Sequence, residues 1–139
     1  MSSEITKKPK VLSAVDLHKS YGAIGGTEVD VLRGVSLDVR AGDMTAIVGT
    51  SGSGKSTLLH LLGGLDTPTG GGLFYRDWDL GSADDDGLTQ YRREAVGFVF
   101  QFYNLIPSLT ARENVALITE IAPDPMTAEE ALALVGLGE

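Results

Sequence analysis

The sequence has 139 residues, which suits a single compact unit with one buried core. Hydrophobic residues make up 42% and charged residues 22%, an ordinary globular composition rather than that of a disordered chain. The net charge of -8 disfavours nucleic acid as a partner, because phosphate backbones are bound by basic surfaces. Cysteine is absent, which excludes disulfides and thiolate chemistry and fits a reducing cytosolic setting.

The first ten residues are polar and predict a loose tail without the apolar segment of a secretory signal. Its basic residues, Lys7, Lys8 and Lys10, favour a solvated tail over a contact with a membrane surface. Apolar runs fall far short of the roughly 20 residues that cross a bilayer, so the sequence predicts a soluble chain.

Strand patterns dominate the next part of the chain. An extended apolar pattern over residues 11–21 predicts a first strand. Apolar and polar residues alternate over 35–40, which predicts a strand with one solvent-exposed face that ends at a turn at 41–43. Residues 44–48 are mostly apolar and predict a short buried strand of a parallel sheet.

After a glycine-rich loop, an apolar pattern from residue 55 predicts a helix that Gly63 and Gly64 end. A short strand is predicted at 73–75. The acidic run Asp84–Asp86 precedes a predicted helix at 88–93, and we interpret it as a helix cap rather than a metal site.

The last third predicts a short apolar strand at 96–100, a loop at 101–107 and two helices. The helix at 110–121 begins with a threonine that is followed three residues later by Glu113, a capping-box pattern. The helix at 127–135 shows the same spacing and is followed by a glycine.

The loop Gly49–Ser56 satisfies the pattern G-x-x-x-x-G-K-[ST]. Glycines let consecutive backbone N–H groups wrap a triphosphate at close range. Lys55 would contact the β and γ phosphates, and the Ser56 hydroxyl would bind Mg²⁺. A strand pattern before the loop and a helix pattern after it favour this P-loop reading over an incidental glycine loop. The predicted nucleotide contacts in this segment are Gly49, Thr50, Ser51, Gly52, Ser53, Gly54, Lys55, Ser56 and Thr57.

From about residue 11 onward the chain resembles the ATP-binding cassette (ABC) ATPases. The resemblance rests on the P-loop together with spaced segments on both sides of it, namely Leu32–Leu37, Leu65–Gly70, Val99–Gln101, Leu105–Pro107 and Glu113–Val115. The run from Phe100 to Pro107 and the run from Leu109 to Val115 most resemble the lipoprotein-release and macrolide-efflux group.

The resemblance implies an α/β fold with a P-loop NTPase (RecA-like) core, an N-terminal antiparallel β subdomain and the start of a helical subdomain at 108–139. Residues 1–10 would be a tail, and 11–139 the N-terminal part of a nucleotide-binding domain with a glutamine loop near residue 101. We expect this fold to be incomplete, because the signature loop, the Asp-Glu strand and the switch histidine of the family do not occur before Glu139.

The resemblance also implies roles for single residues. Tyr21 would stack on adenine, with a strand-end tyrosine packed on the sheet as the alternative. Gln101 would reach Mg²⁺ and the attacking water, with an ordinary surface glutamine as the alternative. Residues 107–113 would face the coupling helices of a membrane partner, with plain packing as the alternative. His18 and His60 do not match the switch histidine and are interpreted as structural.

The implied function is that of an ATP-binding subunit of an exporter, which binds ATP with Mg²⁺ and hydrolyses it in the full-length protein. Its implied partners are transmembrane permease subunits and a second ATP-binding subunit, at the cytoplasmic face of the plasma membrane. No residue matches a catalytic base, so we expect these 139 residues alone to bind nucleotide without hydrolysing it. A non-hydrolysing nucleotide-binding module is the alternative; a GTPase or small-molecule kinase is disfavoured, since no N-K-x-D segment occurs.

Overall fold

The computed structural model describes residues 8–22, 25–101 and 104–138 of the chain. It contains two compact units, Met1–Thr89 and Gln90–Glu139, where the length of the sequence predicts one. The boundary between the two units lies between residues 89 and 90, and the strand expected further along the chain at 96–100 does not form. None of the helices in the described part of the chain has the length and apolar character needed to cross a bilayer.

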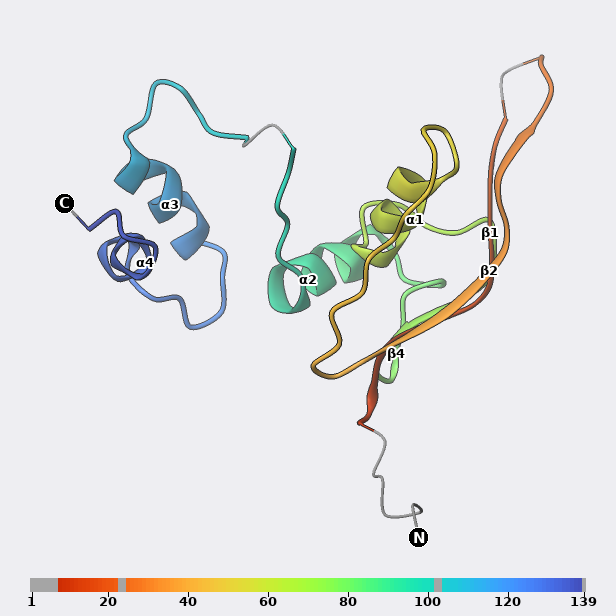
Figure 1. The fold of residues 1–139 in the computed structure, drawn as a ribbon, viewed down its shortest axis with the longest axis horizontal. Coiled ribbons are helices and arrows are strands. Elements are labelled where there is room, and N and C mark those ends of the chain that lie inside the picture. Colours follow the sequence, from red (N-terminus) through yellow and green to blue (C-terminus); the bar gives the residue numbers. More distant parts are fainter. Residues whose placement is uncertain (1–7, 23–24, 102–103, 139) are drawn as a thin grey trace, which may run out of the picture. The chain divides into compact units, whose positions relative to one another are not determined.

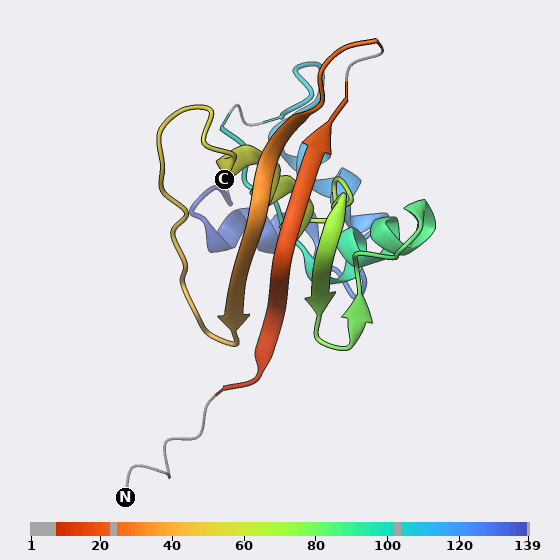
Figure 2. The ribbon, with the colours of Figure 1, turned by 90° about the vertical axis from the view of Figure 1, so that its right-hand side faces the viewer.

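The first unit contains a four-stranded sheet in the order β2-β1-β3-β4 (Figures 1 and 2). Its strands are β1 (Lys10–Tyr21), β2 (Val29–Arg40), β3 (Gly70–Tyr75) and β4 (Trp78–Asp79). Every neighbouring pair is antiparallel. The antiparallel β subdomain predicted from the sequence is therefore confirmed.

A bulge in the middle of β1 bends the sheet. The pairing register shifts there against both neighbouring strands, and Asp16 has a positive φ of 50°. Gly34 on β2 and Gly71 on β3 flank the bulge with φ angles of 100° and 85°. A Cβ on Gly71 would lie only 2.1 Å from the carbonyl oxygen of Asp16, so only glycine fits beside the bulge.

Helix α1 (Lys55–Leu62) lies against one face of this sheet (Figure 2). The predicted helix and its end at Gly63 are confirmed, and three of its leucines, Leu58, Leu61 and Leu62, are buried. The core of the first unit consists of buried side chains from the sheet, from α1 and from the segment that follows β4, namely Ala14, Leu17, Leu32, Leu58, Leu61, Leu62, Leu73, Leu80 and Leu88. Packing against β1 and β2 thus fixes the position of α1.

Helix α2 (Asp85–Ala95) contains the helix predicted at 88–93, but it begins three residues earlier, inside the acidic run. The Asp84 carboxylate accepts a hydrogen bond from the Gly87 N–H at 2.8 Å, which confirms a capping role for this run.

Two short helices make up most of the second unit, α3 (Ala111–Thr119) and α4 (Ala128–Leu134). The predicted capping box is confirmed at α3, where Thr110 accepts from the Glu113 N–H and the Glu113 carboxylate accepts from the Thr110 N–H. The Arg112 guanidinium also donates a hydrogen bond to the Glu129 carboxylate on α4.

A single amide side chain fixes the segment that precedes α3. The Asn114 side chain accepts from the Ile106 N–H at 2.8 Å and donates to the carbonyl oxygens of Ile106, Leu109 and Thr110. This asparagine therefore holds the start of the second unit's helices to the chain before them.

Two strand predictions are wrong. Residues 44–48 and 96–100 have no regular secondary structure, and Met44, Val48 and Val99 are almost fully exposed. A strand is stable only when neighbouring strands satisfy its backbone N–H and C=O groups. Within the described ranges no other segment pairs with either run, so their apolar composition is not enough to make them strands.

We predict that Thr110→Ala will destabilise α3, because the first-turn N–H groups lose a side-chain cap worth about 1 kcal/mol. Amide hydrogen exchange should be faster in the first turn of α3. Thr119→Ala is the control, since Thr119 donates to the Ala116 carbonyl near the helix end and caps no N–H group. Equal exchange rates in the two variants would contradict the capping assignment.

Candidate phosphate-binding site

The glycine loop has a backbone that only glycine adopts easily. Gly52 and Gly54 have φ angles of 80° and 97°, in the left-handed region. A Cβ on Gly54 would also lie 3.1 Å from a methyl carbon of Leu32 and 3.3 Å from the Val31 carbonyl oxygen. A Cβ on Gly49 would lie 2.6 Å from the Ser53 hydroxyl oxygen. Close approach therefore shapes both ends of the loop, whereas the left-handed dihedral angles occur at Gly52 and Gly54.

The loop delivers the chain directly into α1. Gly54 is the N-cap of this helix, and no side chain caps it. The first N–H groups of an α-helix have no partner within the helix, and the helix dipole adds partial positive charge at this end. The beginning of α1 therefore offers backbone donors to an anion.

The Lys55 side chain folds back over the loop. Its ammonium donates hydrogen bonds to the carbonyl oxygens of Gly49 and Thr50, the second at 3.1 Å. The Ser53 N–H donates to the same Thr50 carbonyl at 3.1 Å. The positive charge is thus held within the curve of the loop, where a bound phosphate would meet it.

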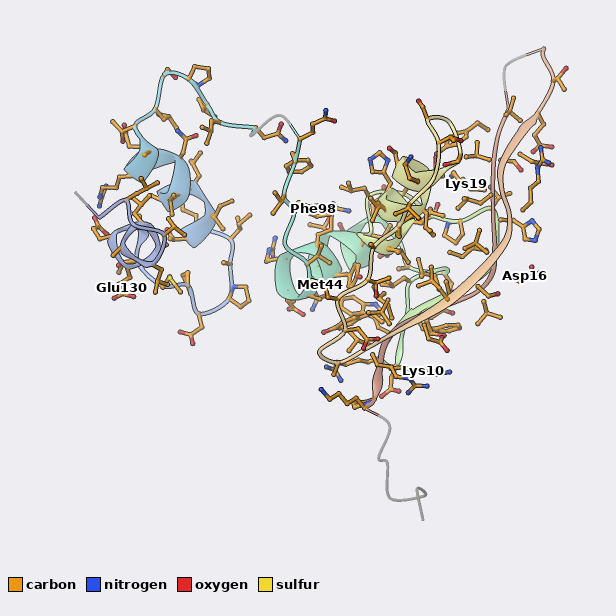
Figure 3. All side chains as sticks on the ribbon, in the orientation of Figure 1. Lys10, Asp16, Lys19, Met44, Phe98 and Glu130 are labelled. Atoms are coloured by element: carbon orange, nitrogen blue, oxygen red, sulfur yellow. The ribbon has the colours of Figure 1, made fainter. Side chains whose placement is uncertain are left out.

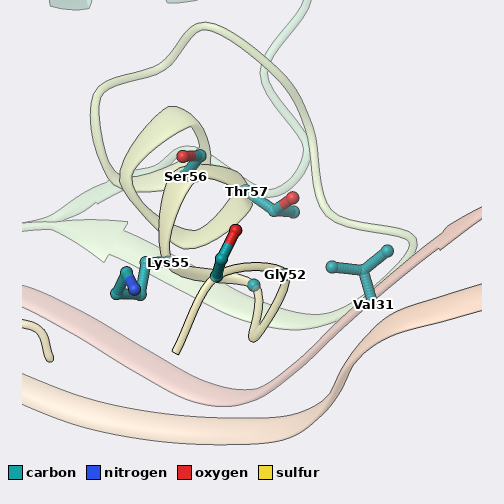
Figure 4. Close-up of a pocket in the computed structure, with 7 residues that line it drawn as sticks. Val31, Gly52, Lys55, Ser56 and Thr57 are labelled. Atoms are coloured by element: carbon teal, nitrogen blue, oxygen red, sulfur yellow. The ribbon is translucent and has the colours of Figure 1, made fainter. Parts of the chain in front are cut away.

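An open pocket of about 500 Å³ lies over the loop (Figure 4). It is lined by loop and helix residues on one side and by a β2 side chain on the other, namely Ser51, Gly52, Gly54, Lys55, Ser56, Thr57 and Val31. Its polar groups are hydroxyls and one ammonium, and no carboxylate or imidazole is among these lining residues. The described pocket can bind an anion but supplies no general base.

The donor set also fits a magnesium ion that arrives with a phosphate ligand. Mg²⁺ keeps several waters and is usually held by one or two protein oxygens together with substrate phosphates. The Ser56 hydroxyl, on the first turn of α1, is an oxygen ligand of this kind. Among the described residues, no three His, Cys, Asp or Glu side chains cluster as a separate metal site.

Tyr21 lies at the end of β1, and its side chain is 44% exposed. It pairs with Val29 on β2, two residues before the Val31 that lines the pocket. Two residues of a strand span about 7 Å, so the register places Tyr21 near the β2 side of the pocket. Gln101 is exposed and belongs to the second unit, so its contact with Mg²⁺ and the attacking water stays a prediction.

The structure adds three residues that the motif did not reveal. Val31 forms the pocket wall opposite the loop, and Lys19 and Asp66 form an ion pair with a distance of 3.2 Å beside Tyr21. Lys19 lies two residues before Tyr21, but the pairing register of β1 shifts between Lys19 and Ser20, so simple alternation does not place the two side chains. No local pattern links Asp66 to either residue.

The loop, its helix and the pocket have the glycine loop–helix arrangement of the P-loop class of proteins. The sequence profile described as ABC transporter matches residues 32–139. This chain therefore belongs to the ABC transporter family.

The relatives confirm the resemblance to the lipoprotein-release and macrolide-efflux group. The lipoprotein-releasing system ATP-binding protein LolD of Idiomarina loihiensis is 48% identical over 132 residues, which are 91% of this chain and 58% of LolD. The macrolide export ATP-binding/permease protein MacB of Nitrosomonas europaea is 49% identical over 112 residues, 81% of this chain and 17% of MacB. The chain thus spans less than two thirds of these relatives.

A solved structure confirms the fold class. The ATP-binding cassette MJ0796, in a dimeric post-hydrolysis state bound to ADP and Pi, superimposes with a TM-score of 0.79 at 37% identity. The match covers 90% of this chain and 57% of that one. The described sheet and helices therefore form part of an ABC-type P-loop fold.

We predict that Gly54→Ala will lower the free energy of unfolding of the first unit by about 2 to 3 kcal/mol. The alanine would be strained by its positive φ, and its methyl group would also crowd β2. Gly52→Ala is the matched control, since Gly52 has the same kind of backbone but no heavy atom within 4 Å of an added Cβ. It should cost only about 1 kcal/mol. Urea unfolding of both variants measures the difference, and equal losses would show that contact with β2 does not shape the loop.

Proposed function

We propose that this chain is an ATP-binding subunit of an ABC exporter and that it binds ATP with Mg²⁺ at the loop Gly49–Ser56. The observation that carries the proposal is the loop geometry, in which glycine backbone, an uncapped helix start and the Lys55 ammonium face one pocket. Two similar proteins support the proposal. LolD is named an ATP-binding protein, and the cassette MJ0796 was solved with bound ADP and Pi.

Each group of the pocket has a distinct task in this proposal. The loop N–H groups bind the phosphate oxygens, and Lys55 exchanges a backbone carbonyl for an oxygen of the β or γ phosphate. The Ser56 hydroxyl would hold Mg²⁺, which would offset negative charge on the phosphates. Val31 covers the side of the pocket that faces β2 and reduces the access of water.

Two further residues complete the proposed site. The Tyr21 ring stacks on adenine through its π-face, which accepts the base without reading its edges. Gln101 would supply its side-chain oxygen to Mg²⁺ and to the attacking water. The support for Tyr21 is its register beside Val31, and the support for Gln101 is its spacing from the P-loop in the sequence.

The proposed partners are transmembrane permease subunits and a second ATP-binding subunit. The names of the relatives, which describe releasing and export systems, support this part of the proposal, as does the dimeric state of the neighbouring cassette. Residues 107–113 are proposed to face the permease. The protein would then act in the cytoplasm, at the inner face of the plasma membrane. In the full-length protein, hydrolysis would drive export.

A non-hydrolysing nucleotide-binding module is the second candidate. It is favoured by the pocket lining, in which the described residues include no carboxylate that could activate water. Steady-state release of inorganic phosphate separates the two functions. Turnover by this chain would support hydrolysis within the described residues, whereas ATP binding without turnover would support the binding module for these 139 residues.

We predict that Lys55→Met will weaken ATP binding in the presence of Mg²⁺ by about 10- to 100-fold, because a charge-assisted bond to phosphate is lost. Isothermal titration calorimetry of the 139-residue chain measures the affinity. Lys10→Met, on β1, also removes one positive charge but outside the pocket, and should keep the wild-type affinity. Wild-type affinity in Lys55→Met, or an equal loss in Lys10→Met, would exclude the loop as the phosphate site.

A further inference from the structure

An ion pair with a largely buried lysine and a partly exposed aspartate lies beside Tyr21 at the end of β1. Only 12% of the Lys19 side chain is exposed, and its ammonium lies 3.2 Å from a carboxylate oxygen of Asp66. The ammonium also donates a hydrogen bond to the Thr67 carbonyl oxygen at 2.8 Å. A charge with so little exposure is stable only when it is paired and hydrogen-bonded, and both conditions are met here.

The same two residues contact the Tyr21 ring from two directions. The Lys19 ammonium lies over the ring, 5.1 Å from its centroid. The Tyr21 hydroxyl donates a long hydrogen bond of 3.4 Å to the Asp66 carboxylate. A tyrosine side chain has two free torsions, and a cation over its face together with a partner at its hydroxyl restricts both.

The Asp66 carboxylate is itself held in place. Burial raises its pKa, but hydrogen bonds from the Thr67 N–H and from Lys19 lower it further, so that the pKa lies below its usual value. The carboxylate is therefore ionised at neutral pH. Backbone bonds fix the segment on both sides, from Leu65 N–H to the His60 carbonyl and from Thr69 N–H to the His18 carbonyl, each at 2.8 Å.

We propose that Lys19 and Asp66 are positioning residues for Tyr21, which hold its ring so that one face meets the ammonium and the opposite face is open to adenine. This inference rests on the proposed function, in which Tyr21 stacks on the base. In this proposal, the affinity for the adenine base depends on an ion pair whose two residues do not line the phosphate pocket. Without Lys19 and Asp66, the half-exposed ring would have to be ordered each time nucleotide binds.

A second ion pair on β1 provides a matched control. Lys10 and Asp38 lie 3.1 Å apart, but their side chains are 50% and 39% exposed. Lys10 lies at the opposite end of β1 from Lys19 (Figure 3). Lys10→Met and Lys19→Met therefore remove the same charge and the same kind of bond from the same strand, and only Lys19→Met removes a contact with Tyr21.

The experiment compares two ligands, ATP and inorganic tripolyphosphate, which share the phosphates but not the base. Calorimetry is done on the 139-residue wild type and on the variants Lys19→Met, Asp66→Asn, Tyr21→Ala and Lys10→Met. We expect Tyr21→Ala to lose about 5- to 100-fold in ATP affinity. Lys19→Met and Asp66→Asn should lose about 3- to 10-fold, and Lys10→Met should be unchanged. Tripolyphosphate affinity should stay at the wild-type value in all four variants.

Each failure has a different meaning. If wild type binds neither ligand, the proposed function fails. If Tyr21→Ala weakens ATP while Lys19→Met and Asp66→Asn keep wild-type affinity, the positioning role is overturned and the function stands. Equal losses for both ligands in Lys19→Met would show that Lys19 supports the fold instead, and would also overturn the positioning role.

A ligand-free measurement tests the geometry separately. The ring-proton NMR signals of Tyr21, assigned by their loss in Tyr21→Phe, report on the cation over the ring. They should move in Lys19→Met and stay in place in Lys10→Met. Unchanged Tyr21 signals in Lys19→Met would overturn the positioning role whatever the affinities are.

Discussion

The contact between Gly54 and β2 is the constraint on which the site depends. Gly54 has a left-handed backbone there, and an added Cβ would lie 3.1 Å from the Leu32 side chain and 3.3 Å from the Val31 carbonyl oxygen, which is tighter than an ordinary contact. Because the loop is held against β2, α1 begins at that point and directs its uncapped N–H groups into the pocket. The buried leucines of α1 then pack on the same sheet. A sheet that carries no part of the glycine motif thus sets the position of the loop.

The end of α1 is tied to the sheet as well. Gly54 joins its beginning to β2, and Asp66, a few residues beyond its end, joins the following segment to Lys19 on β1. The pairing of β1 with β2 connects these two contacts and places Tyr21 near Val31. The phosphate loop and the proposed base platform are therefore held by one rigid frame, which suits a ligand that carries a phosphate group at one end and a base at the other.

Sequence patterns correctly predicted the elements that are stabilised by interactions between residues close together in the sequence. The glycine loop, its helix, the caps at Asp84 and Thr110 and the alternating strands follow from dihedral preferences and neighbouring side chains. The runs 44–48 and 96–100 were wrongly predicted, because a strand also needs partners. The Lys19–Asp66 pair joins segments far apart in sequence, and no spacing rule reveals it. Local patterns also do not identify the partners of the chain, because the match covers only 58% of the length of a relative such as LolD.

The central claim is that backbone amides of the glycine loop bind the phosphates of ATP. A titration of the ¹⁵N-labelled chain with ATP and Mg²⁺ tests it most directly, because it observes each amide without mutation. We predict that the amide signals of residues 49–57 shift most, and that tripolyphosphate shifts the same signals. Binding of ATP with the largest shifts elsewhere, for example on β3 and β4, would contradict it.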